Sequence, residues 1–350
     1  MKQAAASLEP YHGTLAVAVA FTLTGLSTVI VALRFYCRYY LMSKLSSPDY
    51  VMLVALICTW GSAVINLYQI HFLDYTHAWD SRQAYQDIVT GSLLSWWIYR
   101  IFYLVDTCLI KTSILLFYNQ IASSHKNYHY IVKTMLAIVV LGALGMVIAA
   151  ILSCVPVTDA WSFEVFWGGF YGKHAKMCYN PVLLWFFSAG FNLVTDTILW
   201  IIPPIFLLNL QALGTKRRLE LIGIFSIGIV AVVASAIRLY VLALWTSNWA
   251  EQGKRNGDLL IWGQVEQHAG IISASIPFLR PLFRKVCCTG ARRHPPSPSP
   301  AAKLIQPIPP RTPIIPSPSP TLGSHEFKVP PSPLSPISPV QAEMSIGSAV

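Results

Sequence analysis

Seven long runs of apolar residues follow one another along the chain, separated by short polar stretches. They lie near residues 14–36, 50–71, 91–117, 132–153, 182–208, 219–246 and 259–283. A helix needs about 20 consecutive apolar residues to cross the hydrocarbon core of a bilayer. Each run reaches that length, so the pattern predicts an all-α fold in which seven transmembrane helices form a bundle.

The composition agrees with a membrane protein. The chain has 350 residues, of which 54% are hydrophobic and only 11% are charged, whereas soluble domains carry about 25% charged residues. Its net charge of +10 would also suit a protein that binds nucleic acid. The lysines and arginines cluster at the ends of the apolar runs, however, as membrane proteins place them. We therefore expect a lipid bilayer as partner and no nucleic acid.

The distribution of lysine and arginine predicts the orientation, because cytosolic loops carry the excess of these residues. With the N-terminus outside, six of them face outward: Lys2, Arg82, Lys173, Lys176, Lys254 and Arg255. Thirteen face inward: Arg34, Arg38, Lys44, Lys126, Lys133, Lys216, Arg217, Arg218, Arg280, Arg284, Lys285, Arg292 and Arg293. Residues 1–13 are then a short extracellular N-terminus and 14–285 the seven-transmembrane domain. We expect a multi-pass protein, in the plasma membrane rather than an internal one.

The last part of the chain has a different composition. Residues 294–350 hold 16 of the 24 prolines and almost no aromatic residues, so they cannot bury enough apolar surface to fold. We expect residues 286–350 to be a disordered, Pro/Ser-rich cytosolic tail. Eight of its Ser or Thr residues precede proline: Ser297, Ser299, Thr312, Ser317, Ser319, Ser332, Ser335 and Ser338. Two hypotheses stay open, a tail that is phosphorylated and docks SH3 or WW domains, and a neutral linker-like tail.

Polar residues interrupt several of the apolar runs. The set comprises Arg100, Asp106, Lys111, Asn192, Asp196, Arg238, Glu266 and His268. Ionisable groups inside lipid are costly and are by default paired or functional. Depth pairs Arg238 with Glu266 and places Asp106 and Asp196 in a central acidic layer. The set is either a structural polar network that holds the bundle together, or a ligand pocket or proton-active site.

The cysteines suggest two local features and no metal motif. Cys154 and Cys178 flank the fourth loop, which faces the oxidising side in the predicted orientation, so they are a candidate disulfide. Two free thiols are the alternative. Cys287 and Cys288 come just inside the membrane, a context typical of S-palmitoylation.

We expect no cofactor. A retinal Schiff base needs a lysine in the bundle core, usually on the last helix, and the run at 259–283 has none. Lys133 stands at the end of the fourth predicted span, so Lys111 is the only lysine embedded deeper in one. It lies low enough in the third span to extend its ammonium group toward the inner interface.

A series of short motifs recurs in order along residues 20–283. They are Arg34-x3-Arg38 with Asp49-Tyr50, Lys111-x-Ser113 before Leu115-Leu116-Phe117-Tyr118, Cys154-x-Pro156, Trp161, Cys178, Asn192-x3-Asp196, Pro203, Lys216-Arg217-Arg218, Gly228, Ser235-x2-Arg238, Glu266 and Pro277. As an ordered set they resemble the fungal rhodopsin-domain family of seven-helix membrane proteins. Two positions depart from it, since the family often has an acidic pair at Pro48-Asp49 and a basic residue at Asn119. The resemblance implies a receptor-like protein, and some members resemble products of secondary-metabolite clusters.

Two functional hypotheses follow. The first is a receptor-like sensor of an extracellular signal. It would bind a small molecule or a surface ligand at the outer mouth and report to cytosolic signalling proteins through the inner loops and the tail. The second is a membrane-embedded enzyme or accessory factor in fungal secondary-metabolite biosynthesis. In that case Asp106, Asp196 or Glu266 would be the catalytic acid or base.

Overall fold

The computed structural model describes residues 12–43, 45–72, 81–121, 126–171, 177–208, 215–247 and 249–291. The long helices are α2 (Gly13–Tyr36), α3 (Ser47–Phe72), α4 (Arg82–Ile121), α5 (Lys126–Ile151), α7 (Pro181–Leu208), α8 (Thr215–Ser247) and α9 (Trp249–Ala291). Three short helical elements accompany them: a π-helix η1 (Cys37–Leu41), a 3₁₀-helix η3 (Val157–Trp161) and α6 (Phe163–Phe170). No strand occurs within these ranges, and the prediction of an all-α bundle is confirmed.

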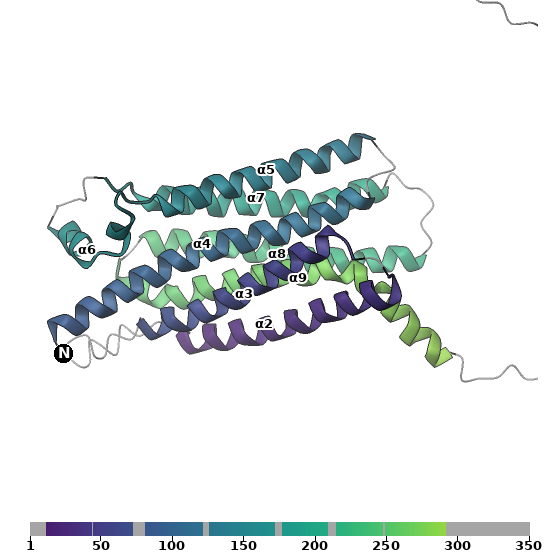
Figure 1. The fold of residues 1–350 in the computed structure, drawn as a ribbon, viewed down its shortest axis with the longest axis horizontal. Helices are drawn as coiled ribbons and strands as arrows, with labels where there is room; N and C mark the ends of the chain where they lie inside the picture. The colour runs from purple at the N-terminus through teal and green to yellow at the C-terminus, as the bar shows by residue number, and fades with distance from the viewer. Residues whose placement is uncertain are drawn as a thin grey trace, which may run out of the picture. The chain divides into compact units, whose positions relative to one another are not determined.

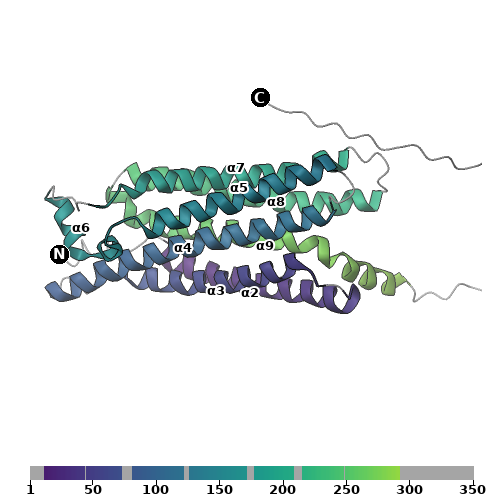
Figure 2. The same cartoon turned by 45° about the horizontal axis from the view of Figure 1, so that its top comes forward.

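The long helices lie side by side along one direction (Figures 1 and 2). Helices α2 and α3 form one side of the bundle and α5 and α7 the other, with α4, α8 and α9 between them. Helix α4 packs against α3, α5 and α9, and α9 packs against α2, α4 and α8. Helices α4 and α9 therefore have packing partners on several sides, which places them at the centre of the bundle.

The surface of the bundle is apolar and its interior is partly polar. Leu141 and Leu183 are 67% and 78% exposed, whereas Arg34, Asp49 and Gln69 are fully buried. Water-soluble proteins show the opposite arrangement, because long polar side chains normally face solvent. An apolar exterior over helices of this length fits contact with lipid chains.

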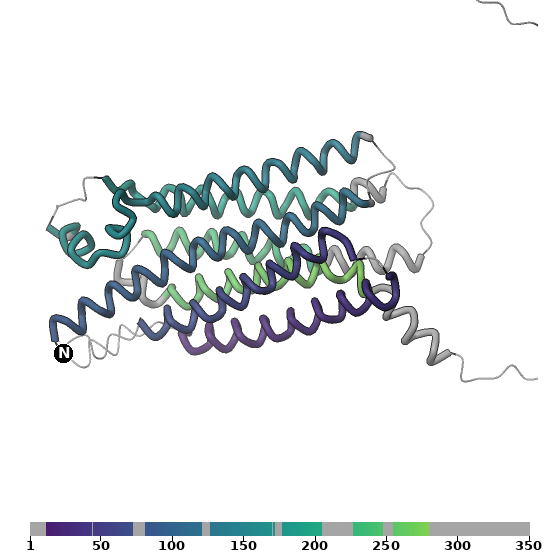
Figure 3. The backbone as a smooth tube through the Cα atoms, viewed as in Figure 1, coloured from purple at the N-terminus to yellow at the C-terminus, as the bar shows by residue number. Residues whose placement is uncertain are grey.

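Six helices in the described ranges are long and apolar enough to cross a bilayer: α2 with η1, α3, α4, α5, α7 and α8. The remaining long helix, α9, has 43 residues, but the segment Gln264–His268 at its centre is mostly polar and lowers its hydropathy. Its polar residues face inward, where Gln264, Glu266 and His268 are buried. It lies along the others (Figure 3) and completes the bundle.

Two helices are much longer than the apolar runs that predicted them. Helix α4 has 40 residues, about 60 Å at 1.5 Å per residue, whereas the apolar run covers residues 91–117. Helix α9 likewise extends beyond residues 259–283. A run of apolar residues marks only the part of a helix that lies in lipid. The turns that extend into water can consist of polar residues, so the apolar pattern does not reveal them.

A structured segment covers the predicted outer end of the bundle, where η3 and α6 lie (Figure 1). Cys154 and Cys178 form a disulfide bond, and the chain beside it pairs through a hydrogen bond from Val155 N to Met177 O at 3.1 Å. The rings of Trp97 in α4 and Trp161 in η3 lie 5.1 Å apart. These contacts fix the segment onto α4.

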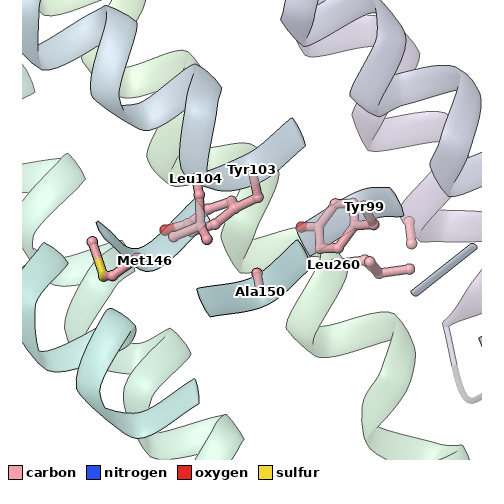
Figure 4. Close-up of a cluster of buried hydrophobic side chains, with 7 residues drawn as sticks. Tyr99, Tyr103, Leu104, Met146, Ala150 and Leu260 are labelled. Atoms are coloured by element: carbon pink, nitrogen blue, oxygen red, sulfur yellow. The ribbon is translucent and has the colours of Figure 1, made fainter. Parts of the chain in front are cut away.

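A cluster of apolar side chains joins α2, α4, α5 and α9 in the predicted outer half of the bundle (Figure 4). It contains Ala16, Tyr99, Tyr103, Leu104, Met146, Ala150 and Leu260. The two tyrosines also place hydroxyl groups in the interior, beside the charged residues described below.

A second buried cluster joins the predicted inner ends of α2, α3 and α9. Asp49 accepts hydrogen bonds from Arg34 Nε at 3.1 Å and Arg38 Nε at 2.9 Å. Arg34 also donates to Ala274 O at 3.0 Å, and its guanidinium lies 4.0 Å from the centre of the Phe278 ring. The aspartate therefore bridges two arginines that would otherwise repel each other, and offsets one of their two charges.

Replacing Asp49 tests that cluster. Asp49→Asn leaves two buried guanidinium groups without an anion, and breaking a buried pair in this way costs roughly 3–5 kcal/mol. We expect a large loss of thermal stability of the purified protein in detergent. Lys133→Gln, at an exposed position of α5, is the matched control and should change little. Equal stability of the two variants would contradict a structural role for Asp49.

The disulfide should stabilise the outer segment. The two cysteines are 24 residues apart, and closing a loop of this size contributes roughly 3 kcal/mol. We expect dithiothreitol and the Cys154→Ser substitution to lower the unfolding temperature equally, because each removes the same bond. Dithiothreitol should then have no further effect on the Cys154→Ser, Cys178→Ser double variant; a further drop in that variant would locate the sensitive bond elsewhere.

Candidate functional site: a charged network inside the bundle

Lys111 of α4 is held by one turn of α7. Its Nζ donates to Asn192 O at 3.0 Å, Asn192 Oδ1 at 2.5 Å and Thr195 Oγ1 at 2.6 Å. The same atom lies 3.0 Å from Asp196 Oδ1. Residues 192, 195 and 196 share a helix face because they are three and four positions apart. That spacing gives the ammonium group all its partners from one direction.

The expectation that Lys111 extends toward the inner interface is wrong. Its side chain is only 7% exposed and the ammonium group points into the bundle. A lysine moves its charge to an interface when the interior offers no partners. Here a carboxylate and three further acceptor atoms surround the charge, so it stays inside.

Asn192 connects this pair to two further helices. Its Nδ2 lies 3.0 Å from Tyr103 Oη, 3.3 Å from Asp196 Oδ2 and 3.4 Å from Ser235 Oγ. It also lies within hydrogen-bond distance of Glu266 Oε1. Ser235 of α8 donates to Asp196 Oδ2 at 2.8 Å. One amide thus joins α4, α7, α8 and α9 in a single network.

Arg238 and Glu266 form the second charged pair. Arg238 Nη1 lies 3.9 Å from Glu266 Oε2, and its guanidinium lies 3.7 Å from the centre of the Tyr103 ring. Tyr103 in turn donates to Glu266 Oε1 at 2.7 Å. The two cations, Lys111 and Arg238, balance the two carboxylates, Asp196 and Glu266, so the network is neutral as a whole.

A cavity of about 60 Å³ lies beside the network between α4, α7, α8 and α9. This volume holds about four water molecules, since each needs at least about 10–15 Å³ by this measure. Its charged and polar lining consists of Lys111, Asp196, Glu266, Gln267, Thr107, Tyr118 and Ser273. Neither polar atom of the Gln267 side chain has a partner among the described residues, nor does Glu266 Oε2 accept a hydrogen bond there. Apolar residues form the remaining wall, namely Ile110, Ile114, Leu199, Trp200, Pro203 and Ala231.

Gly228 of α8 allows the wall of this cavity to close. A β-carbon added there would lie 2.9 Å from Cδ1 of Trp200 on α7. Real β-carbons do not approach a neighbour so closely, so the indole ring of Trp200 can occupy this position only because residue 228 is glycine. The contact sets how closely α7 and α8 approach each other at the cavity.

Three residues of the predicted set do not contact the network. Arg100 stacks on the Trp185 ring at 4.2 Å. Asp106 contacts Thr59 of α3 at 3.0 and 3.2 Å. His268 contacts a separate group of polar side chains: Ser27 at 2.8 Å, Gln264 at 3.1 Å and Thr24 at 3.3 Å. Asp106 and Asp196, which the sequence places in one central acidic layer, thus take different partners.

Several residues of the network are not in the predicted set. Tyr103, Thr195 and Ser235 are uncharged, so they do not stand out within an apolar run. One signal for two of them is helical spacing, since Thr195 lies three residues after Asn192 and Ser235 lies three before Arg238. Asp49 and its two arginines were identified only as landmarks. Cys287 and Cys288 fall in α9, but their side chains lie outside the described part of the chain, as does everything after Ala291.

The chain is similar to two fungal proteins whose names refer to biosynthetic gene clusters. "Polyenoic acids biosynthesis gene cluster protein Ba17b" of Metarhizium anisopliae is 22% identical over 276 residues, which is 75% of this chain and 72% of that protein. "Fugralins biosynthesis cluster protein 2" of Gibberella zeae is 22% identical over 293 residues, which is 81% of this chain and 68% of that protein. No solved structure matches the chain.

A family model places the chain more firmly than these distant relatives do. The model described as the fungal rhodopsin domain matches residues 33–285. That range begins in α2 and ends in α9, so it contains the Lys111 network, the disulfide and the Asp49 cluster. The chain therefore belongs to the fungal rhodopsin domain family and is a multi-pass membrane protein.

Proposed function

We propose that this protein is a receptor-like sensor that binds a small lipophilic molecule in the cavity between α4, α7, α8 and α9. The observation that carries the proposal is the lining of that cavity. Gln267, whose side-chain polar atoms have no partner among the described residues, lines it together with apolar side chains. Ligand sites in proteins combine a few polar groups with a mostly apolar wall in this way.

The charges around the cavity favour an uncharged ligand. Lys111 is fully engaged by α7, and the carboxylates of Asp196 and Glu266 are balanced by Lys111 and Arg238. A charged ligand would lose its hydration without gaining a counter-ion, which is costly. Gln267 offers both a donor and an acceptor, so it suits a hydroxyl, an amide or a protonated carboxylic acid.

Binding would change the spacing of the helices. Ligand cavities usually measure about 300–1,000 Å³, whereas this one has about 60 Å³. A ligand must therefore separate α7 from α8 at the Trp200–Gly228 contact in order to enter. A site that is wider when occupied gives the two-state behaviour that a sensor needs. The predicted inner ends of these helices would report the change to cytosolic signalling proteins, from the plasma membrane.

The names of the relatives support a lipophilic metabolite as the ligand. One name refers to polyenoic acids and the other to fugralins biosynthesis. A polyenoic acid has an apolar chain and one polar end, which suits a cavity lined by both apolar and polar side chains. The ligand would then be a product or intermediate of a biosynthetic pathway.

The second candidate is an enzyme or accessory factor of such a pathway. It is favoured by the position of Asp196 and Glu266, whose carboxylates line the same cavity and are two of the three expected acid/base residues. Both are engaged by cations or hydroxyl groups, which makes them weaker bases. For that reason we prefer the sensor.

Deleting the gene separates the two candidates. For a sensor we expect an altered transcriptional response, measured by RNA sequencing, while the enzymes of the pathway still complete their product. For an enzyme, an unprocessed intermediate should accumulate and be detected by mass spectrometry of the culture extract. That accumulation would refute the sensor.

A single methyl group tests the cavity itself. Gly228→Ala should push Trp200 into the cavity and abolish the response, with the amount of protein in the membrane unchanged. Gly145→Ala on α5 is the matched control, because a β-carbon there meets nothing within 4 Å. The readout is the transcriptional response of a strain that carries each variant. A full response with Gly228→Ala would exclude this cavity as the binding site.

A further inference from the structure

Asp106 differs from the other buried carboxyls in having no cation beside it. It is fully buried, and within the described residues no lysine, arginine or histidine lies at ion-pair distance from it. Asp49, Asp196 and Glu266, by contrast, each have a cation within 4.0 Å. Burying an ionised carboxylate without a counter-ion is costly, and such a group takes up a proton instead. The missing cation therefore favours a proton on Asp106.

The geometry at Thr59 supports the same assignment. The hydroxyl oxygen of Thr59 lies 2.8 Å from Ala55 O and 3.0 Å and 3.2 Å from the two carboxyl oxygens of Asp106. A hydroxyl has one proton and two lone pairs. Thr59 therefore offers a single proton to three acceptor oxygens, one of them the carbonyl of Ala55. One shared hydroxyl proton does not replace a counter-ion for Asp106.

A polar face of α3 leads from Asp106 to the predicted outer end of the bundle. Thr59, Ser62, Asn66 and Gln69 are all fully buried. Steps of three, four and three residues keep them on one helix face, and they span about 15 Å at 1.5 Å per residue. Gln69 lies three residues before the end of α3 at Phe72. The polar face thus covers about half the thickness of a hydrocarbon core of about 30 Å.

Most of the polar atoms along this face have no protein partner. Both side-chain polar atoms of Asn66 and of Gln69 lack a partner within the described residues. Buried polar groups in proteins are almost always hydrogen-bonded, and internal water supplies the bond where protein does not. Water molecules are therefore the partners that this rule implies for the two amides.

The other walls of this region are polar and already satisfied. Gln264 of α9 donates to Ser62 Oγ at 3.1 Å and contacts His268 Nε2 at 3.1 Å. His268 contacts Ser27 of α2 at 2.8 Å. These groups hold α2, α3 and α9 around the polar face. Ser62, which links them to the face, lies between Thr59 and Asn66.

We propose that Asp106 is a proton-binding site, and that a file of water molecules along Thr59, Ser62, Asn66 and Gln69 exchanges its proton with the medium at the predicted outer end. The carboxyl group gives its proton to the adjacent water, and the resulting carboxylate takes a proton back by the same route. This site is separate from the ligand cavity and does not depend on the proposed sensor function.

The ionisable groups near Asp106 leave this assignment in place. On α3 and α4, the Cys58 thiol and the Tyr99 phenol are close enough to interact electrostatically with the carboxyl group; both are neutral at pH 7. Lys111, Arg238 and Glu266 of α4, α8 and α9 each belong to a pair of the neutral network. The remaining charged group in the core of α4, Arg100, stacks on the Trp185 ring of α7. His268 of α9 contacts only uncharged partners.

Infrared spectroscopy of the full-length protein in lipid nanodiscs tests the proposal. A protonated carboxylic acid has a C=O stretch well separated from the amide bands, and the band shifts when the acid exchanges into D₂O. We expect this band at neutral pH in the wild type and its loss in Asp106→Asn. Asp106→Asn should also keep or raise the unfolding temperature, since it removes no ion pair. Absence of the band, or a band unchanged by Asp106→Asn, would refute the site.

The water file is tested by the rate at which the band shifts in D₂O. The Asn66→Leu, Gln69→Leu double variant should slow the shift severalfold. The matched control is Thr22→Val, which changes an exposed side chain on α2 that bonds only its own helix. Equal rates in the double variant, the control and the wild type would refute the path while leaving the proton on Asp106. If the double variant does not accumulate, Gln69→Leu alone gives the same comparison.

Discussion

The pairing of Lys111 with one turn of α7 is the interaction on which the centre of the bundle depends. Inside lipid, apolar packing gives helices little reason to prefer one neighbour, because the lipid chains are as apolar as the side chains. A buried charge is different, since separating it from its partner is very costly. Lys111 needs Asn192, Thr195 and Asp196 together, and only one rotation and one depth of α7 against α4 supplies them. Helices α8 and α9 then follow through Ser235 and Glu266.

The sequence predicts which segments lie in lipid and which residues are costly there, but not how those residues pair. Apolar runs locate every long helix, because lipid demands them, and charged residues stand out within such runs. Depth also pairs Arg238 with Glu266, which lie 3.9 Å apart. The partners of Lys111 and Asp106 depend instead on how each helix is rotated about its axis, which the apolar pattern does not fix. Tyr103 is indistinguishable from an ordinary packing residue until the position of Glu266 is known.

The interior is divided into two regions of different chemistry. Charged pairs fill the region between α4, α7, α8 and α9. Uncharged amides, hydroxyls and one histidine fill the predicted outer part of the region between α2, α3, α4 and α9, and the Asp49 cluster lies at its predicted inner end. Helices α4 and α9 border both regions. Two tyrosines of α4, four residues apart, contact α9: Tyr103 bonds Glu266, and Tyr99 lies against Gly263. A displacement of α4 or α9 would therefore change the side-chain contacts in both regions at once.

The length of α4 has a mechanical consequence. Its first turns extend beyond the apolar run, and Tyr85 there packs against Phe163 and Trp167 of α6, with ring centres 5.7 Å and 6.1 Å apart. An α-helix bends little over a few turns, so the segment from Tyr85 to Lys111 behaves as one stiff body about 39 Å long. A movement of α6 would therefore be transmitted along α4 to the ammonium group of Lys111 and to the residues of α7 that bind it.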